Sequence, residues 1–113
     1  MSKVLILANY DVGLYKFRKE LISELLKDNE VYISLPYGNL VPYLIDMGCQ
    51  FIDTPINRRG INPSTDFKLL LNYLSIMKKV KPDLVISYTI KPNLYGGTMA
   101  RILNIPFAII LLA

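Results

Sequence analysis

The sequence has no histidine and only one cysteine, Cys49. Without histidine the chain cannot form most zinc sites, a Ser-His or Cys-His nucleophile pair, or a catalytic step that needs an imidazole base. A single cysteine cannot form a disulfide within the chain, so the cysteine content gives no sign of an oxidising compartment. Histidine-dependent hydrolases and disulfide-stabilised secreted domains are therefore excluded.

Long hydrophobic runs are absent as well. The apolar run at residues 4–8 ends at Asn9 and is too short for the core of a signal peptide or for a membrane span. The run at residues 105–113 is interrupted by Pro106 and is also too short to cross a bilayer. We therefore expect a cytoplasmic protein. Its net charge of +4 favours anionic partners, namely phosphates, nucleic acid or an acidic lipid surface, without choosing among them.

What the sequence does contain is a regular alternation of short apolar runs and longer helical patterns. Hydrophobic residues make up 52% of the 113 residues, enough for one packed domain. The predicted strands are residues 3–8, 30–35, 50–54, 83–87 and 107–112, and the predicted helices are 14–27, 40–47, 62–81 and one from about 91–93 to Asn104. The apolar face of the first helix consists of Leu14, Phe17, Leu21 and Leu25. The alternation predicts an α/β fold, a Rossmann-like, doubly wound parallel sheet of five strands in three layers, in the order 3-2-1-4-5.

The carboxyl ends of the strands are the expected ligand-binding edge of such a sheet. The strand order reverses between the first and fourth strands, so the loops at residues 9–13 and 88–93 face the same crevice. The loop after the third strand, which contains Arg58 and Arg59, is placed to form a wall of this cleft. The first loop lacks the G-x-G-x-x-G spacing of dinucleotide-binding proteins, and the chain has no Walker-type phosphate loop. We therefore do not expect the familiar modes of NAD or ATP binding.

Several residues at this edge have both a functional and a structural interpretation. Asp11 is the only carboxylate in either of the two loops; it can accept a proton from a sugar hydroxyl, or it can form a turn or cap the helix. Gly13 can admit a phosphate or a sugar to the helix N-terminus, or it can simply make the turn. Arg58 and Arg59 can clamp a phosphate or carboxylate, or remain solvated. Lys91, at the start of a helix, can bind an anion together with the free backbone N–H groups there.

Four segments resemble the corresponding parts of the bacterial family-4 glycosyltransferases, which have the GT-B fold. They are residues 5–21 (LILANYDVGLYKFRKEL), 33–38 (ISLPYG), 53–63 (DTPINRRGINP) and 88–97 (YTIKPNLYGG). The resemblance covers nearly the whole chain in order. It is specific in the loops after the first, third and fourth predicted strands.

The resemblance implies two Rossmann-like domains that face each other across a cleft. The first binds the acceptor, often a lipid-linked sugar at the inner membrane, and the second binds most of the nucleotide-sugar donor. No metal is needed, and members of the family serve capsule, exopolysaccharide or lipopolysaccharide synthesis. Residues 1–113 then form the N-terminal, acceptor-side domain, without the donor-binding domain. We expect a truncated chain, a disrupted reading frame or one subunit of a split enzyme, with negligible activity alone.

The resemblance also implies roles for particular residues. The first loop, with Asn9, Asp11 and Gly13, would line the cleft beside the transferring sugar, and Asp11 is the catalytic candidate. The substrate-binding candidates are Asn9, Gly13, Arg58, Arg59, Thr89, Lys91 and Asn93. Many relatives have a histidine near the Lys91 loop, and this chain has none. In the retaining chemistry common in the family, the donor's own phosphate can assist the incoming hydroxyl, so a strong protein base is not obligatory.

A different function stays open, that of a non-catalytic subunit that binds the acceptor or docks on the membrane. The helix at residues 62–81 favours it, because Leu69, Tyr73 and Ile76 extend its apolar stripe beyond what one sheet face needs. The same stripe can instead pack within the domain. A phosphoacceptor receiver domain is disfavoured, since its magnesium site needs an acidic cluster and only Asp11 follows the first strand. Nucleic acid is not an expected partner, because the basic residues are scattered and form no motif.

Overall fold

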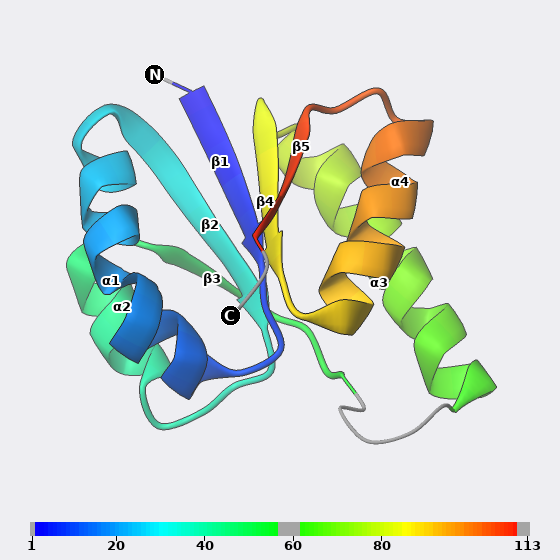
Figure 1. Cartoon of the computed structure of the whole chain (residues 1–113), viewed down its shortest axis with the longest axis horizontal. Coiled ribbons are helices and arrows are strands. Elements are labelled where there is room, and N and C mark those ends of the chain that lie inside the picture. The colour runs from blue at the N-terminus through cyan, green and yellow to red at the C-terminus, as the bar shows by residue number, and fades with distance from the viewer. Residues whose placement is uncertain (1, 57–61, 111–113) are drawn as a thin grey trace.

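The computed structural model describes residues 2–56 and 62–110, which form three layers (Figure 1). The strands are β1 (Ser2–Leu7), β2 (Asn29–Leu35), β3 (Gln50–Asp53), β4 (Leu84–Tyr88) and β5 (Phe107–Ile110). They pair in the order β3-β2-β1-β4-β5, and all four pairings are parallel. This order confirms the predicted five-stranded Rossmann-like sheet, with its switch point between β1 and β4.

The helices cover both faces of the sheet. On one face lie α1 (Asp11–Asp28) and α2 (Val41–Met47). On the other face lie α3 (Pro63–Val80), the π-helical turn η1 (Pro92–Gly96) and α4 (Gly97–Ile102), which continues η1 directly. Figure 1 shows α1 and α2 to the left of the sheet and α3 and α4 to its right. Each parallel strand is thus reached through a helix that crosses one face of the sheet.

The central strand β1 is buried on both of its faces. Val4 and Ile6 pack on the side of α1 and α2, whereas Leu5 and Leu7 pack on the side of α3. Each of these four side chains is at most 3% exposed. Successive side chains of a strand point to opposite faces, so a strand covered on both sides needs a continuous aliphatic run.

Local signals fix the ends of two helices, as the sequence predicts. The side-chain oxygen of Asn62 accepts a hydrogen bond from the backbone N–H of Thr65 at 3.3 Å, and Pro63 occupies the first turn of α3. α3 ends where Lys81 adopts the left-handed conformation, with φ of 54°. α2 ends at Gly48, whose φ of 121° suits glycine.

The start of α1 differs from the prediction. The helix begins at Asp11 rather than at Leu14, so Asp11 belongs to the first turn and not to the preceding loop. The Asp11 carboxylate accepts a hydrogen bond from the backbone N–H of Leu40 at 2.7 Å. A negative charge in the first turn also interacts favourably with the helix dipole. Both contacts extend the helix into residues that hydrophobic periodicity does not mark.

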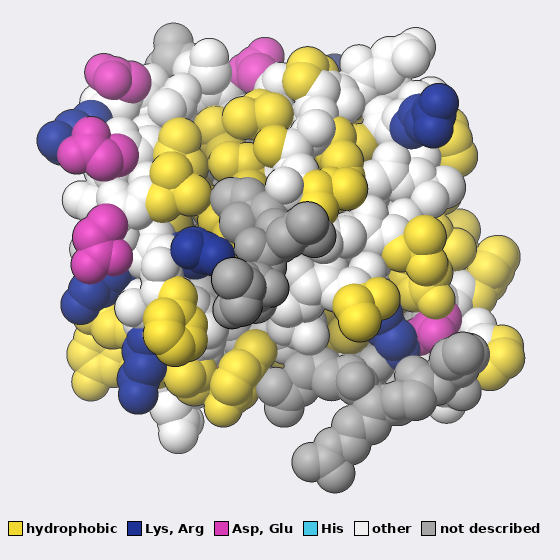
Figure 2. Space-filling view, in the orientation of Figure 1, with side chains coloured by type: hydrophobic (Ala, Val, Ile, Leu, Met, Phe, Trp, Pro, Cys, Tyr) yellow, Lys and Arg dark blue, Asp and Glu magenta, His cyan; other side chains and the backbone are white. Residues whose placement is uncertain are grey.

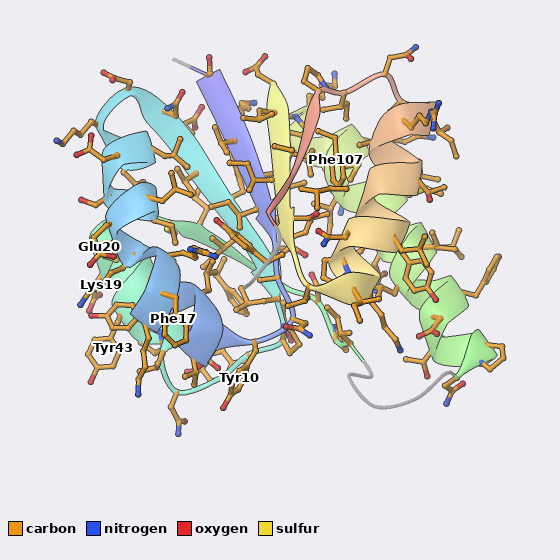
Figure 3. All side chains as sticks on the ribbon, in the orientation of Figure 1. Tyr10, Phe17, Lys19, Glu20, Tyr43 and Phe107 are labelled. Atoms are coloured by element: carbon orange, nitrogen blue, oxygen red, sulfur yellow. The ribbon has the colours of Figure 1, made fainter. Side chains whose placement is uncertain are left out.

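The prediction that Phe17 belongs to the core face of α1 is wrong. Its side chain is 69% exposed, and the buried apolar residues of this helix are Leu14 and Ile22. Figure 3 shows Phe17 on the outer side of α1. Phe17 lies at the margin of the apolar stripe, near the helix start at the carboxyl edge of the sheet, where it borders a hollow described below.

The wide apolar stripe of α3 packs within the domain, which is the second of the two interpretations that the sequence left open. Leu69, Tyr73 and Ile76 are 1%, 0% and 8% exposed, and they share a cluster with Leu5 and Leu7 of β1. α3 contacts η1 and α4 as well as the sheet, so it needs a wider apolar stripe than a helix with one neighbour. This stripe therefore packs within the domain and gives no support to a docking surface.

Two consecutive glycines bring η1 and α4 close to the sheet. A side-chain carbon at Gly96 would collide with Leu7, and one at Gly97 would lie 2.8 Å from the ring of Phe107. A larger residue at either position would force Leu7 or Phe107 to move, or would push the helix away from the sheet. Close helix–sheet packing is therefore sufficient to explain the Gly-Gly pair.

Candidate functional site

The carboxyl ends of β1 and β4 lie side by side, as predicted. Leu7 of β1 is in register with Ser87 of β4, so residues 8–13 and 88–93 leave the sheet next to each other. A cavity of about 120 Å³ lies between these two segments, and we call it the β1–β4 hollow. A wider cavity of about 420 Å³ lies between residues 9–12 and residues 36–39, and we call it the β1–β2 hollow.

Three of the predicted substrate-binding residues line the β1–β4 hollow, namely Asn9, Gly13 and Thr89. Gly13 lies inside α1 and does not have the positive φ that would require glycine. No atom lies within 4 Å of where its side-chain carbon would be, so packing does not require glycine either. Gly13 therefore does not make a turn, and its predicted contact with a phosphate or sugar stays a prediction.

Arg18 and Tyr88 also line this hollow, and the sequence did not single out either of them. The guanidinium carbon of Arg18 lies 5.4 Å from the centre of the Tyr88 ring. Tyr88 is only 4% exposed, and burial raises the pKa of its hydroxyl, with the Arg18 charge acting in the opposite direction. Among the described residues, neither the Tyr88 hydroxyl nor the Nε of Arg18 has a hydrogen-bond partner.

Thr89 turns the chain sharply as it leaves β4. Its φ of 70° is unusual for a β-branched residue, and its hydroxyl donates to the carbonyl oxygen of Tyr88. Nearby, the buried Ser87 hydroxyl donates to the side-chain oxygen of Asn93. The predicted residue Asn93 is therefore held against the end of β4. Strained backbone of this kind is common where a ligand is bound.

Asp11 lines the β1–β2 hollow and connects the two segments that border it. Its hydrogen bond from the Leu40 N–H links the start of α1 to the segment after β2, and the residue is only 4% exposed. A side-chain carbon at Gly38 would collide with the Asp11 carboxylate, so glycine there makes room for the acid. This geometry gives Asp11 a structural role at the cleft. Its predicted role as a proton acceptor stays a prediction.

Lys91 lies in a different environment from the one that the sequence suggested. Its Nζ is 2.8 Å from a carboxylate oxygen of Asp66, and the Tyr95 hydroxyl donates to the other oxygen at 3.2 Å. The hydrogen bond from Lys91 lowers the pKa of Asp66, and burial raises the pKa of Tyr95. Asp66 occupies the buried stripe of α3 with Leu69 and was missed. An acid on an apolar helix face was the available signal, because such an acid requires a partner.

The remaining sequence predictions concern two arginines, the single cysteine, metal binding and membrane spans. The predicted residues Arg58 and Arg59 lie outside the described residues, so their roles stay predictions. Burial raises the pKa of the Cys49 thiol to about 11, which makes Cys49 a poor nucleophile. Within residues 2–56 and 62–110, no group of three or more acidic or thiol side chains is placed to hold a metal ion. In the same part of the chain, every helix is too short or too polar to cross a membrane.

A larger hollow of about 740 Å³ lies along η1, α4 and β5, and it reaches this edge only at Ile90 and the predicted residue Asn93. Its lining is mostly apolar and includes the exposed side chains of Ile90, Leu94 and Ile109. It has few of the convergent polar groups that orient a substrate. The two hollows at the switch point therefore remain the better candidates for a functional site.

Solved structures with the same fold include glycosyltransferases and a UDP-GlcNAc 2-epimerase. MurG of Acinetobacter baumannii has a TM-score of 0.77 at 22% identity, over 98% of this chain and 34% of that one. A glycosyltransferase of Rickettsia africae has a TM-score of 0.74 at 20% identity, over 96% of this chain and 29% of that one. A UDP-GlcNAc 2-epimerase of Neisseria meningitidis reaches 0.70 at 15% identity, over 96% of this chain and 32% of that one. At these identities the likeness shows the fold alone.

The chain spans about a third of the length of these structures, and in the two glycosyltransferases it matches one domain of the GT-B fold. No curated protein matches the sequence. The family described as glycosyl transferase 4-like matches residues 3–112. This agrees with the resemblance found in the loops after β1, β3 and β4. The chain belongs to the glycosyl transferase 4-like family.

Proposed function

We propose that this chain is the acceptor-side domain of a glycosyltransferase that moves a hexose from a nucleotide sugar to a lipid-linked or polysaccharide acceptor. The observation that carries this proposal is the open edge at β1 and β4, where residues 8–13 and 88–93 enclose the β1–β4 hollow. Family membership supplies the reaction class. The pathway we propose is the synthesis of capsule, exopolysaccharide or lipopolysaccharide.

The substrate contacts follow from which groups line the two hollows. Asn9, Gly13 and Thr89 border the smaller cavity, where a sugar ring or its phosphate can reach the start of α1. Asn93 supports this wall through Ser87. Lys91 acts by holding the loop after β4 against Asp66, which is an indirect contribution to binding. Arg58 and Arg59 are proposed to contact the acceptor or the diphosphate.

Asp11 is the proposed catalytic residue, as the carboxylate that receives the proton of the acceptor hydroxyl. One of its oxygens is occupied by the Leu40 N–H, which fixes the carboxylate at the wall of the β1–β2 hollow. In a retaining reaction the donor phosphate can assist the hydroxyl, so positioning and stabilisation of the leaving diphosphate would supply most of the rate. No metal is required in this scheme.

The variant Asp11→Asn separates the two roles of this residue. Asparagine keeps an oxygen that can accept the Leu40 N–H, but it cannot take up a proton. We expect the variant to remain folded and to lose about 100-fold or more in transfer rate when a donor-binding domain of the family is supplied in trans. Unchanged transfer by a folded variant would remove Asp11 from the chemistry and leave it as a structural residue.

We also propose that the domain works at the cytoplasmic face of the membrane, as a peripheral protein. Tyr10, Phe17 and Tyr43 are 46%, 69% and 54% exposed around the start of α1 and on α2. Lys16 is exposed on the same helix as Phe17. Figure 2 shows hydrophobic and basic side chains next to each other on this part of the surface. Aromatic and basic side chains together suit an anionic lipid surface where a lipid-linked acceptor is presented.

The test of the proposed function compares donor binding with transfer. Labelled nucleotide sugar is mixed with the chain alone, and then with the chain, a donor-binding domain of the family and a polyprenyl diphosphate sugar. We expect weak donor binding and negligible turnover by the chain alone, and transfer to the lipid in the full mixture. Tight binding of the nucleotide sugar by this chain alone would contradict the assignment of the donor site to another domain.

A further inference from the structure

The β1–β4 hollow contains two polar groups that the fold itself leaves unused. The Tyr88 hydroxyl is buried in a residue that is 4% exposed, and it has no partner among the described residues. The Nε of Arg18, from the neighbouring helix α1, is also buried and also lacks a hydrogen-bond partner among the described residues. Both residues line the hollow. A buried polar group without a partner is costly, and such a group beside a cavity indicates a ligand that supplies the missing bond.

The groups around this hollow are mainly hydrogen-bond donors. Arg18 has five N–H donors and no acceptor, and the Tyr88 hydroxyl can donate. Gly13 leaves the first turn of α1 uncovered on this side, and the first backbone N–H groups of a helix have no partner within the helix. No acidic side chain is among the described residues that line the cavity. This combination selects an anion over a cation or a neutral apolar group.

The volume of the hollow limits the size of that anion. A cavity of about 120 Å³ has room for roughly four water molecules, each of which occupies about 30 Å³ in the liquid. That space accommodates one tetrahedral phosphate group but not a nucleotide or a complete sugar diphosphate. The rest of a larger ligand must extend from the hollow towards solvent, past Tyr10 and Phe17, which are exposed at its rim.

We propose that Arg18, Tyr88 and the first turn of α1 bind one phosphate group of a sugar substrate in the β1–β4 hollow. The guanidinium donates to the phosphate oxygens while it lies against the Tyr88 ring, and the Tyr88 hydroxyl donates to the same group. This inference rests on the proposed sugar transfer for its biological ligand, but phosphate binding is measurable without it. The phosphate comes either from the nucleotide donor or from the lipid-linked acceptor.

The direct test is a titration of the isotope-labelled chain with inorganic pyrophosphate, followed by NMR. We expect shifts at residues 9–14 and 88–90. Arg18→Gln should weaken binding by about ten-fold or more, and Tyr88→Phe by about three-fold or more, because each removes a hydrogen bond to a charged group. Two matched controls should bind within about two-fold of the wild type. Lys19→Gln removes an exposed charge next to Arg18, and Tyr73→Phe removes the other buried tyrosyl hydroxyl without a partner.

Further ligands distinguish the two sources of phosphate. If UDP binds with higher affinity than pyrophosphate and its binding depends on Arg18, the site belongs to the donor. If geranyl diphosphate binds with higher affinity than pyrophosphate and its binding depends on Arg18, the site belongs to the acceptor. Equal binding of all three, still dependent on Arg18, supports a general phosphate site. Equal losses in Arg18→Gln and Lys19→Gln would overturn the proposal, since binding would then reflect net charge.

The two proposals fail in different ways. In one outcome, acceptor sugars bind at residues 36–39 and 88–93, but pyrophosphate shows no binding that depends on Arg18. That result would refute the phosphate site and leave the proposed function intact. Arg18-dependent pyrophosphate binding without any binding or transfer of sugars would refute the proposed function alone. Thermal unfolding of each variant shows that it is folded. Tyr88→Phe should melt at or above the temperature of the wild type, because the hydroxyl that it removes has no partner within the described fold.

Discussion

Two polar clusters lie near the carboxyl edge of the sheet, and they differ in how their hydrogen bonds are satisfied. In the first, Asp66, Lys91 and Tyr95 bind one another at 2.8 and 3.2 Å, and the two charges cancel. In the second, Arg18 and Tyr88 meet only through a cation–π contact, and their polar atoms lack partners among the described residues. The sequence had singled out Lys91 for ligand binding and had passed over Arg18. The comparison teaches that a charge paired within the fold stabilises it, whereas buried polar groups without partners indicate a ligand where they lie beside a cavity.

The largest expected effect comes from breaking the satisfied cluster. Lys91→Met leaves the Asp66 carboxylate, whose side chain is 8% exposed, without its cation. We expect the melting temperature, followed by circular dichroism, to fall by about 12 °C or more. Lys68→Met, which removes an exposed lysine from α3, is the control and should change it little. If Lys91→Met melts at the same temperature as the wild type, the Lys91–Asp66 pair contributes nothing to stability.

A smaller loss is expected from Gly38→Ala, which tests how Asp11 is held. The added carbon would occupy the position of the Asp11 carboxylate, so the acid must move and give up its bond to Leu40. We expect the free energy of unfolding, measured with urea, to fall by about 1–3 kcal/mol. An unchanged urea midpoint would mean that the segment after β2 moves without cost and that Asp11 is loosely held.

Gly13→Ala is expected to increase stability rather than reduce it. This variant tests the second cluster, that of Arg18 and Tyr88, because Gly13 lines the same hollow. Gly13 lies within α1 with open space around it, so alanine should raise the free energy of unfolding by about 0.5–1 kcal/mol. The new methyl group enters the β1–β4 hollow and should weaken pyrophosphate binding. A variant that gains stability and keeps full binding would show that no ligand approaches α1 at this point.

The smallest effect concerns the dependence of stability on pH. Because the pKa of Asp66 is lower in the folded chain than its ordinary value of 3.8, the ionised carboxylate stabilises the fold above that pH. This contribution is lost as the pH falls through the lower, folded pKa. The difference in urea midpoint between the wild type and Asp66→Asn should therefore be constant near pH 6 and narrow once the pH falls below 3.8. A difference that stays constant as the pH falls below 3.8 would contradict the assigned ion pair.

The fold was predictable because its signals are local. The aliphatic run of β1, the Asn62-Pro63 start of α3 and the glycine after α2 each determine an element within a few residues. Alternation of strands and helices then leaves few strand orders to consider. The position of the ligand edge follows from that order and not from any motif.

The details of the site were not predictable, because they depend on contacts between distant residues. Lys91 and Asp66 are 25 residues apart, and their pairing requires α3 to pack beside η1. Whether Phe17 is buried depends on how α1 is rotated on the sheet, which periodicity fixes only to within the width of the apolar stripe. The contact of Arg18 with Tyr88 likewise appears only when α1 lies over the end of β4.

The central claim is that a sugar substrate binds at the carboxyl ends of β1 and β4, and one measurement tests it most directly. The isotope-labelled chain is titrated with a water-soluble, short-chain polyprenyl diphosphate sugar, and the shifted backbone amides are mapped by NMR. The account predicts saturable shifts confined to residues 8–13, 36–39 and 88–93, which are weakened by Arg18→Gln and retained by Lys19→Gln. Shifts centred on residues 97–109 of α4 and β5, or no saturable binding by the folded chain, would contradict it.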